Sequence, residues 1–533
     1  MSALRATVLI ASFSLLSKLL GAVRQAVFAN RFGAGEEIDI YVAAFRVPDL
    51  LFNLLILGTL SVAFIPVFVS YLNRGKGPSF EIASTIFNIT LVAMGALSLL
   101  GAFAAPVLVR AIVPGFGEIQ TTQTIALTRI LMLSPLLFSL SSVLSSILHS
   151  FKRFLLAAVA PLFYNLSIIF GVWYLYPRWG LRGLAYGVVL GAALHFLIQL
   201  PAAVRLGLRP LSFWNWRHPG VQKIAKLFWP RVFGVELGQI SLLVASVIAS
   251  FQAAGSLAIF YFAYDLETVP LGVFAMSFAI AAFPTMADYF SKNNIQGFKT
   301  FFAQTVVQIL FLMIPISVLV LLLRAQIVRL ILGAGENTAF SFADTRLTAQ
   351  ALGFFALSLF AQSLVPLLAR GFYAMQNTII PVFSGLAAAG VNIALAVLFA
   401  KYFGPPGMAL AFSIAIVLHL LIMLLLLHRR LGDLNDDFLI LRTIKIGIAS
   451  VAMGIATFVT LYAIAPLVDM QTYLGVAIQT VSALLVAVVV YLLAGLLVKL
   501  PETRGLLVVL HSWFSKFTKP ITAALVDLFT DLR

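Results

Sequence analysis

About fourteen long apolar runs limit what this sequence can fold into more than any other feature. A helix needs about 20 apolar residues to cross the roughly 30 Å hydrocarbon layer of a membrane. Because 62% of the residues are hydrophobic and only 10% are charged, a water-soluble globule is excluded. The sequence therefore predicts an all-α polytopic membrane protein with about fourteen transmembrane helices. The runs lie near residues 3–30, 38–72, 80–112, 123–150, 154–177, 181–206, 222–252, 257–290, 299–332, 344–373, 379–401, 405–428, 440–465 and 472–498.

The ends of these runs predict how the chain crosses the membrane. About sixteen Lys and Arg residues follow even-numbered runs and about eight follow odd-numbered runs. Since basic loops stay in the cytoplasm, both termini are predicted to be cytoplasmic. The net charge of +16 is spread over these short loops, so it indicates topology and contact with lipid headgroups, not nucleic acid. We expect no cleavable signal peptide, because the first apolar run continues past twenty residues.

An internal repeat with an offset close to 220 residues predicts two lobes. Gly35 aligns with Gly255 and Tyr41 with Tyr261. Later matches pair the prolines at 66 and 284 and the tyrosines at 71 and 289. Repeats of six helices share one orientation and are typical of transporters with a site between the halves. The predicted domains are an N-lobe at 1–215, a C-lobe at 216–432, two further helices at 433–500, and an amphipathic cytoplasmic tail at 501–533.

Several classes of enzyme and metal site are disfavoured. The chain has no cysteine, and no two of its six histidines have the spacing of zinc ligands on one helical face. A membrane-bound transferase would need a loop-borne cluster of His, Asp and Glu, and none is evident. We therefore expect a transporter that is not an enzyme and has no organic cofactor.

Charged residues inside the predicted spans are the candidate functional residues, because a charge within the hydrocarbon must face protein, water or ligand. Arg24 is a candidate for binding phosphate through paired donors, with a structural ion pair as the alternative. Lys18 lies about 120° from Arg24 around the helix, so it can line a broad wall or extend to the interface. The full set comprises Lys18, Arg24, Asp39, Arg46, Asp49, Glu236, Asp265 and Glu267.

The acidic candidates allow two interpretations each. Asp265 and Glu267 point about 200° apart on a helix, so they do not form a catalytic carboxylate pair. One of them could form an ion pair with an arginine across the repeat interface. That ion pair would be either structural or part of gating or coupling. Glu236, between two glycines, suits either a proton or sodium site or a protonated structural carboxyl group.

The block at 17–72, which begins "SKLLGAVRQAVF", resembles the MurJ/MviN lipid II flippase family of the MOP transporter superfamily. The motif "PGF" at 114–116 and the segment "FFALSLFAQSLVPLLARGFYAMQNTIIPV" at 354–382 extend the resemblance over essentially the whole chain. It implies fourteen helices, two six-helix lobes around a central cavity, and a groove for a lipid tail formed by the last two helices.

The resemblance also implies a function and a location. Family members move undecaprenyl-pyrophosphate-linked disaccharide pentapeptide across the bacterial cytoplasmic membrane by alternating access, in support of peptidoglycan synthesis and cell shape. Cell-wall synthesis and division proteins are the implied protein partners. A sodium ion or the membrane potential is the implied coupling source.

The resemblance assigns roles to individual residues. Ser17, Arg24 and Asp39 match cavity positions of the family directly, and Lys18 stands where an arginine is common. With Arg46 they form the predicted substrate-binding set. Glu236 with Asn392 is the nearest match to a sodium site seen in some members.

The sequence also departs from the family. Many members carry arginine near the position of Asp265, and charged or polar residues where Phe52 and Asn53 stand. These departures leave three alternatives open: export of another lipid-linked oligosaccharide, drug and cation antiport, and a membrane scaffold that no longer transports. Antiport of cationic drugs would favour an acidic cavity without Arg24.

Overall fold

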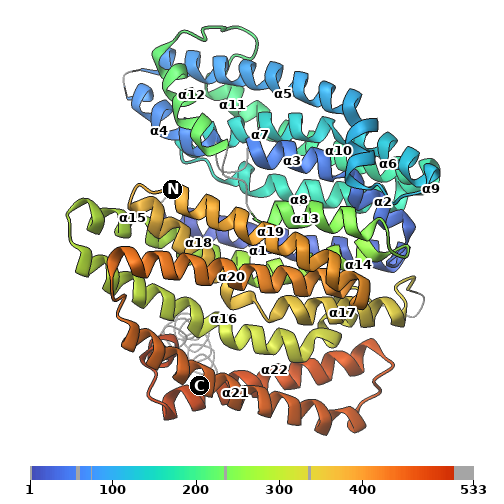
Figure 1. Cartoon of the computed structure of the whole chain (residues 1–533). Helices are drawn as coiled ribbons and strands as arrows, with labels where there is room; N and C mark the ends of the chain where they lie inside the picture. The colour runs from blue at the N-terminus through green and yellow to red at the C-terminus, as the bar shows by residue number, and fades with distance from the viewer. Residues whose placement is uncertain (1–2, 56–59, 74, 233–236, 334–337, 509–533) are drawn as a thin grey trace, which may run out of the picture. The chain divides into compact units, whose positions relative to one another are not determined.

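The computed structural model describes residues 3–55, 60–73, 75–232, 237–333 and 338–508 (Figure 1). Within these ranges the chain is helical and contains no strand, which confirms the predicted all-α class. The helices of the first half are α1 (Ala3–Phe32), α2 (Glu36–Ala44), α3 (Arg46–Leu55), α4 (Leu60–Leu72), α5 (Lys76–Ile112), α6 (Glu118–Leu131), α7 (Leu133–Ser150), α8 (Leu155–Phe170), α9 (Tyr176–Trp179), α10 (Leu181–Leu197), α11 (Leu200–Leu206), α12 (Pro219–Val232) and α13 (Leu237–Ala249).

The second half continues in the same manner. Its helices are α14 (Ser256–Pro270), α15 (Met276–Ser291), α16 (Ile295–Ile331), α17 (Phe342–Ala356), α18 (Leu359–Ala374), α19 (Ile379–Phe403), α20 (Pro405–Leu431), α21 (Asp436–Ile464) and α22 (Tyr473–Leu497). Short π-helical turns at Gly171–Leu175 and Leu271–Ala275 and a 3₁₀ turn at Ala465–Leu467 join some of them.

Every predicted apolar run coincides with helix in the described ranges. Within the described residues, ten helical stretches are long and apolar enough to cross a membrane, or eleven if the bent pair α17 and α18 is one span. Some of these stretches join consecutive helices, such as α6 with α7 and α14 with α15. The remaining three runs correspond to α1, to the series α2–α4, and to α12 with α13. The last two contain positions outside the described residues, so the structure is consistent with fourteen spans. The chain is a multi-pass membrane protein.

Prolines inside the long runs affect the helices differently. Pro270 is followed at once by the π-helical turn Leu271–Ala275, which separates α14 from α15 as expected for a residue that cannot donate a backbone hydrogen bond. Pro284 lies in the same apolar run and Pro315 in the run at 299–332. Both lie within continuous helices instead, α15 and α16.

Internal contacts divide the chain into two compact units. Unit 1 comprises Met1–Leu266, Val328–Ala351 and Gly385–Ala415, and unit 2 comprises Glu267–Ile327, Leu352–Ser384 and Ile416–Arg533. Several unit boundaries fall within helices, such as α14 and α16. The predicted lobes at 1–215 and 216–432 stay a prediction, since this grouping follows contacts and not the sequence repeat.

Unit 1 is packed by small residues where helices approach most closely. Gly183, Gly187 and Gly191 repeat every fourth residue on α10 and face α8 and the π-helical turn that follows it. A Cβ at Gly187 would lie 2.8 Å from the Cα of Gly171. Small residues at this spacing allow membrane helices to pack backbone against backbone.

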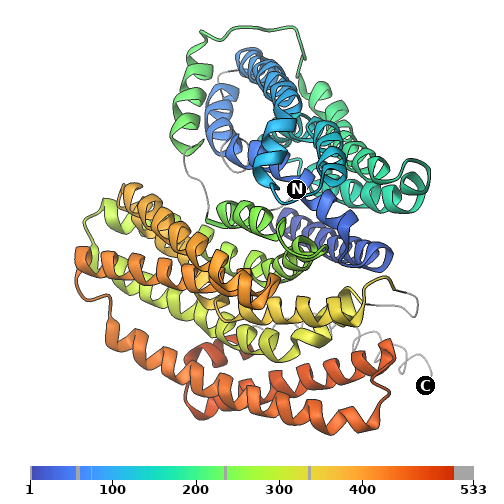
Figure 2. The ribbon, with the colours of Figure 1, turned by 45° about the vertical axis from the view of Figure 1, so that its right-hand side comes forward.

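Unit 2 contains the last two long helices, which run side by side as a hairpin (Figures 1 and 2). Tyr491 of α22 is buried and donates a 2.6 Å hydrogen bond to the carbonyl of Phe311 on α16. This bond satisfies a buried phenol hydroxyl and attaches the hairpin to α16 within the unit. The predicted tail helix is described only to residue 508, so its aromatic positions lie outside the described residues.

Substitution of Gly187 by Leu tests the close packing of α8 on α10. We expect the apparent Tm of the purified protein in detergent to fall by several degrees, because overpacking a tight contact costs about 1–3 kcal/mol. Gly95→Leu is the matched control, since a Cβ at Gly95 on α5 has nothing within 4 Å. Equal melting temperatures for the two variants would contradict this account of the packing.

Candidate functional site

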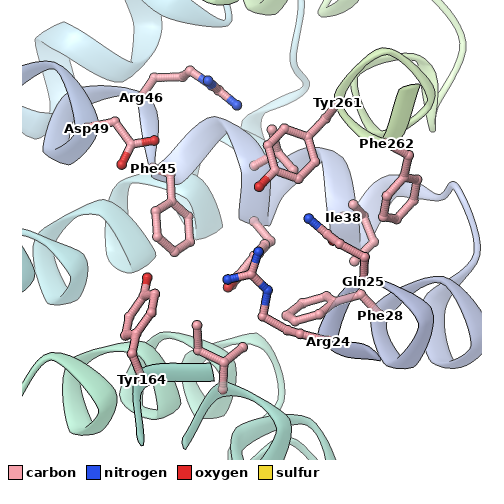
Figure 3. Close-up of a pocket in the computed structure, with 13 residues that line it drawn as sticks. Arg24, Gln25, Phe28, Ile38, Phe45, Arg46, Asp49, Tyr164, Tyr261 and Phe262 are labelled. Atoms are coloured by element: carbon pink, nitrogen blue, oxygen red, sulfur yellow. The ribbon is translucent and has the colours of Figure 1, made fainter. Parts of the chain in front are cut away.

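Unit 1 contains an intramembrane pocket with two arginines, named here the arginine pocket. Its empty volume, including space open to solvent, is about 610 Å³. Helices α1, α2, α3, α8 and α14 supply its walls (Figure 3). The lining residues are Arg24, Gln25, Phe28, Ile38, Tyr41, Val42, Phe45, Arg46, Asp49, Tyr164, Ile168, Tyr261 and Phe262.

Arg24 projects from α1 into the middle of this pocket, with Tyr164 and Tyr261 on either side (Figure 3). Its Nη1 donates a 3.1 Å hydrogen bond to Oδ1 of Asn165 on α8. The Asn165 amide is itself oriented by a 3.2 Å bond to the carbonyl of Pro161. A neutral amide thus positions Arg24 and leaves its positive charge available to a ligand.

Arg46 is the second cation of the pocket and lies at the start of α3. The residue is only 4% exposed, and its Nε has no hydrogen-bond partner among the described residues. The guanidinium carbon lies 5.8 Å from the ring centroid of Tyr261. Asp49, one turn further along α3, also lines the pocket. A buried donor without a partner is costly, so the arrangement favours an anionic ligand.

Asp265 is not among the lining residues of the pocket, but it is hydrogen-bonded to Gln25, which is. Nε2 of Gln25 on α1 donates a 2.6 Å hydrogen bond to Oδ2 of Asp265 on α14. Asp265 also interacts electrostatically with Arg24. The contact joins the first helix of the predicted N-lobe to a helix of the predicted C-lobe. Asp265 therefore connects the cationic wall to α14.

Asp39 of α2 caps the amino end of α14. The side chain is 3% exposed, and its carboxylate accepts hydrogen bonds from the backbone N–H groups of Gly255 at 2.6 Å and Ala258 at 2.8 Å. The first N–H groups of a helix lack partners within the helix and carry a partial positive charge, which a carboxylate neutralises. Asp39 does not line the arginine pocket; it holds α2 against α14.

The backbone at Gly255 explains why α2 and α14 can approach so closely. Gly255 has a φ of +89°, and a Cβ there would overlap the carbonyl oxygen of Ala34. A residue with a side chain would be both strained and displaced at this position. The glycine that the repeat aligns with Gly35 is therefore a requirement of the contact.

Two more contacts join helix ends or loops of the predicted N-lobe to loops of the predicted C-lobe. The Ala339 N–H donates a 2.9 Å hydrogen bond to the carbonyl of Asn30. The N–H of Gly115, in the "PGF" motif, donates a 3.0 Å bond to Oγ of Ser250. Together with the Asp39 cap, these contacts are named here the gate, and all of them involve loops or helix ends after odd-numbered runs.

The remaining predicted site residues lie away from the arginine pocket. Lys18 is exposed on α1, and the backbone carbonyl of Ser17 accepts a 3.5 Å bond from Nδ2 of Asn165. Glu267, in unit 2, is fully buried beside Gln362 on α18, although among the described residues neither carboxylate oxygen has a partner within hydrogen-bond geometry. Asp265 and Glu267 thus point toward different partners, as their spacing predicts.

The predicted sodium site is only partly described. Glu236 lies outside the described residues. Asn392 on α19 is buried, and its Oδ1 accepts a 3.2 Å hydrogen bond from Oγ of Ser241 on α13. These two oxygens are ligands of the kind that a hard cation prefers. In the described ranges no three His, Asp or Glu side chains gather as metal ligands.

Sequence reasoning missed the tyrosines of the pocket. Tyr41 and Tyr261 line it from α2 and α14, and they are the same pair that the internal repeat aligns. That repeat was the signal that could have identified them. Tyr164 and Asn165 carry no charge and lie in an apolar run, so nothing in the sequence distinguished them from residues of the protein core.

A pocket lined by two arginines within a bundle of apolar, membrane-length helices is typical of a membrane transporter of an anionic substrate. The sequence matches the family described as "Lipid II flippase MurJ" over residues 28–485. The chain belongs to this family. This confirms the resemblance and the prediction that the protein is a transporter and not an enzyme.

Similar proteins agree with this assignment. A probable lipid II flippase MurJ from Vibrio cholerae is 30% identical over 443 residues, covering 80% of this chain and 83% of that protein. The lipid II flippase MurJ of Burkholderia cenocepacia is 27% identical, covering 81% and 84%.

Solved structures share the fold. A lipid II flippase MurJ in an inward closed conformation has a TM-score of 0.73 at 23% identity and covers 92% of this chain and 99% of that one. An inward-facing multidrug resistance MATE family transporter of the MOP superfamily has a TM-score of 0.65 at 15% identity, covering 79% and 96%.

Removal of the Asp39 carboxylate tests the gate. In Asp39→Ala, we expect a cysteine placed at Tyr261 to react about tenfold faster with a membrane-impermeant maleimide added to the gate side. Loss of even one hydrogen bond to a charged group weakens the closed state by about 1.5–3 kcal/mol. The sequence has no native cysteine, so the label reports a single site.

Glu37→Gln is the matched control for that experiment. Glu37 lies on the same helix, but its carboxylate accepts hydrogen bonds at 2.7 Å and 3.0 Å from the Tyr176 hydroxyl and not from α14. Its labelling rate should equal that of the parent. An unchanged rate in Asp39→Ala would show that the cap does not hold the gate closed.

Proposed function

We propose that this chain moves lipid II, or a closely related undecaprenyl-pyrophosphate-linked precursor, across the bacterial cytoplasmic membrane by alternating access. The observation that carries the proposal is the pair Arg24 and Arg46, which face one intramembrane pocket where Arg46 Nε lacks a partner among the described residues. The names of its relatives give the same substrate.

The chemistry of the pocket suits a pyrophosphate group. Guanidinium groups bind phosphate oxygens through paired donors and stay charged inside a membrane. Among the residues that line the pocket, two arginines face one carboxylate, Asp49, so the lining keeps a net positive charge. A cationic drug would be repelled by this lining, which argues against drug and cation antiport.

The gate gives the direction of access. Its loops and helix ends follow odd-numbered runs, and the distribution of Lys and Arg predicts that these lie on the outer face of the membrane. The described state is then closed to the outside at the Asp39 cap, and release of the substrate requires these contacts to break. We assign Asp265 to this gating step through its bond with Gln25, and Glu267 to coupling within unit 2.

The last two long helices are proposed to hold the prenyl chain. Apolar side chains on α21 and α22 remain exposed, among them Val451 at 60% and Leu485 at 63%. Such a surface suits contact with an acyl or prenyl chain inside the membrane. Ser17 and Lys18, which lie outside the pocket on α1, are proposed to meet the substrate before it reaches Arg24.

Coupling and protein partners complete the proposal. A sodium ion near Asn392 or the membrane potential would drive the cycle, and cell-wall synthesis or division proteins would supply or receive the precursor. A second function, export of another lipid-linked oligosaccharide, is favoured by one observation. Asp265 stands where many family members carry arginine, so the pyrophosphate would be held mainly by residues of α1 and α3.

Complementation tests the function. In a bacterium depleted of its own lipid II flippase, we expect this chain to restore growth and Arg24→Ala at equal membrane abundance to fail. Arg24→Lys should rescue partly, because an ammonium keeps the charge but loses the paired geometry. Loss of a buried charged partner costs about 2–5 kcal/mol, which corresponds to at least a tenfold fall in precursor flux.

Arg110→Ala is the control in the same assay. Arg110 lies at the end of α5, its side chain is 65% exposed, and its ion pair with Glu118 is long at 4.0 Å. Full rescue by Arg110→Ala is expected. Rescue by Arg24→Ala equal to that of the parent would remove Arg24 from the transport path, and failure of the well-expressed parent would favour another lipid-linked substrate.

A further inference from the structure

A second, larger pocket opens beside the arginine pocket in unit 1 and is named here the α7 pocket. Its empty volume, including space open to solvent, is about 1050 Å³. The two pockets share three lining residues, Phe45, Asp49 and Tyr164, so they adjoin one another. A group bound to Arg24 could therefore extend directly into the α7 pocket.

Aromatic rings form one wall of the α7 pocket. The ring centroid of Phe138 on α7 lies 5.0 Å from that of Tyr164, 5.3 Å from that of His195 and 5.6 Å from that of Phe52. These rings line the pocket as one packed cluster. The cluster offers apolar faces that are held in place, and ligand pockets commonly combine such surfaces with a few fixed polar groups.

The polar groups of the α7 pocket are mostly neutral and oriented by their neighbours. Nδ1 of His195 lies 2.7 Å from the Ser141 hydroxyl, and Nε2 of Gln199 donates a 2.7 Å bond to the same hydroxyl. The Ser145 hydroxyl donates at 2.7 Å to Oε1 of Gln199. This network fixes His195 by one ring nitrogen and leaves Nε2 and the Ser145 oxygen able to bond a ligand.

The charge of the α7 pocket differs from that of its neighbour. Neither Lys nor Arg is among its described lining residues, and Asp49 is the one carboxylate. An anion would find no cation there. A prenyl chain would offer no hydrogen-bond partner to the Asp49 carboxylate, the Ser145 oxygen or His195 Nε2, which makes it a poor occupant. A neutral ring with several hydroxyl groups satisfies both the aromatic wall and the polar groups.

We infer that the α7 pocket is a binding subsite for the sugar that follows the pyrophosphate in the lipid-linked precursor. The inference rests on the proposed function, because it needs the pyrophosphate at Arg24 and Arg46. The apolar face of the sugar packs on Phe138 and Tyr164. Its hydroxyl groups donate to Asp49 and bond with Ser145 and His195. The α7 pocket thus selects precursors that carry a sugar.

Binding of two probes to the purified full-length chain in lipid nanodiscs tests this subsite. The probes are undecaprenyl pyrophosphate, which has no sugar, and the complete lipid-linked disaccharide precursor. The test variants are Phe138→Leu, which removes the ring but keeps an apolar side chain, and Ser145→Ala. Ser139→Ala is the matched control, because Ser139 is buried on the same helix and, among the described residues, bonds the Pro135 carbonyl.

Both variants should raise the Kd for the complete precursor by about three- to tenfold, the range expected for one aromatic contact or hydrogen bond. Their Kd for undecaprenyl pyrophosphate and both values for Ser139→Ala should match the parent. Arg24→Ala should weaken both probes. Equal effects of Phe138→Leu on the two probes, or none on either, would overturn the subsite alone; a parent that binds neither probe would overturn the proposed function as well.

Discussion

The contact between the Asp39 carboxylate and the first turn of α14 holds α2 against α14 within unit 1. Gly255 and Ala258 present N–H groups that have no partner within their own helix, and Asp39 accepts both. Because this pairing is buried, it is stronger than the same contact in water, and it leaves an unsatisfied carboxylate if it opens alone. The cap is therefore stable only when α2, α14 and the loop at Ala34 are assembled together. That property suits a gate with two discrete positions.

The helices next to this contact also carry the charged residues of the arginine pocket. Arg24 lies on α1 and Arg46 on α3, while Tyr261 and Asp265 lie on α14 just beyond the capped turn. The Gln25 bond to Asp265 connects the first helix to α14. Because Tyr261 lies on α14 with the guanidinium carbon of Arg46 5.8 Å from its ring centroid, a movement of α14 relative to α3 would change that distance. The capped turn of α14 and the surroundings of the two arginines thus share one helix within unit 1.

Much of the fold could be predicted from the sequence, and part of the site could not. Hydrophobic length alone located the helices, and the repeat indicated that Tyr41 corresponds to Tyr261. Arg24 and Arg46 were predicted as site residues because a charge within the membrane is costly, and both line one pocket. Asp39 was selected on the same basis, but a single sequence cannot show that its partners are backbone N–H groups of a helix 216 residues further along the chain. Tyr164 and Ser145 carry no charge, so their position depends on tertiary packing that no local pattern encodes.

The most direct test of this account is a reversible crosslink across the gate. Asn30 and Ala339 are joined by a backbone hydrogen bond of 2.9 Å, so cysteines at these two positions are close enough to form a disulfide in a chain without native cysteine. The measurement is the rate at which the lipid-linked precursor reaches the outer leaflet, before oxidation, after oxidation, and after reduction. The account predicts that oxidation stops transport only in the double-cysteine variant and that reduction restores it. Undiminished transport with the crosslink fully formed would contradict a gate that must open in each cycle.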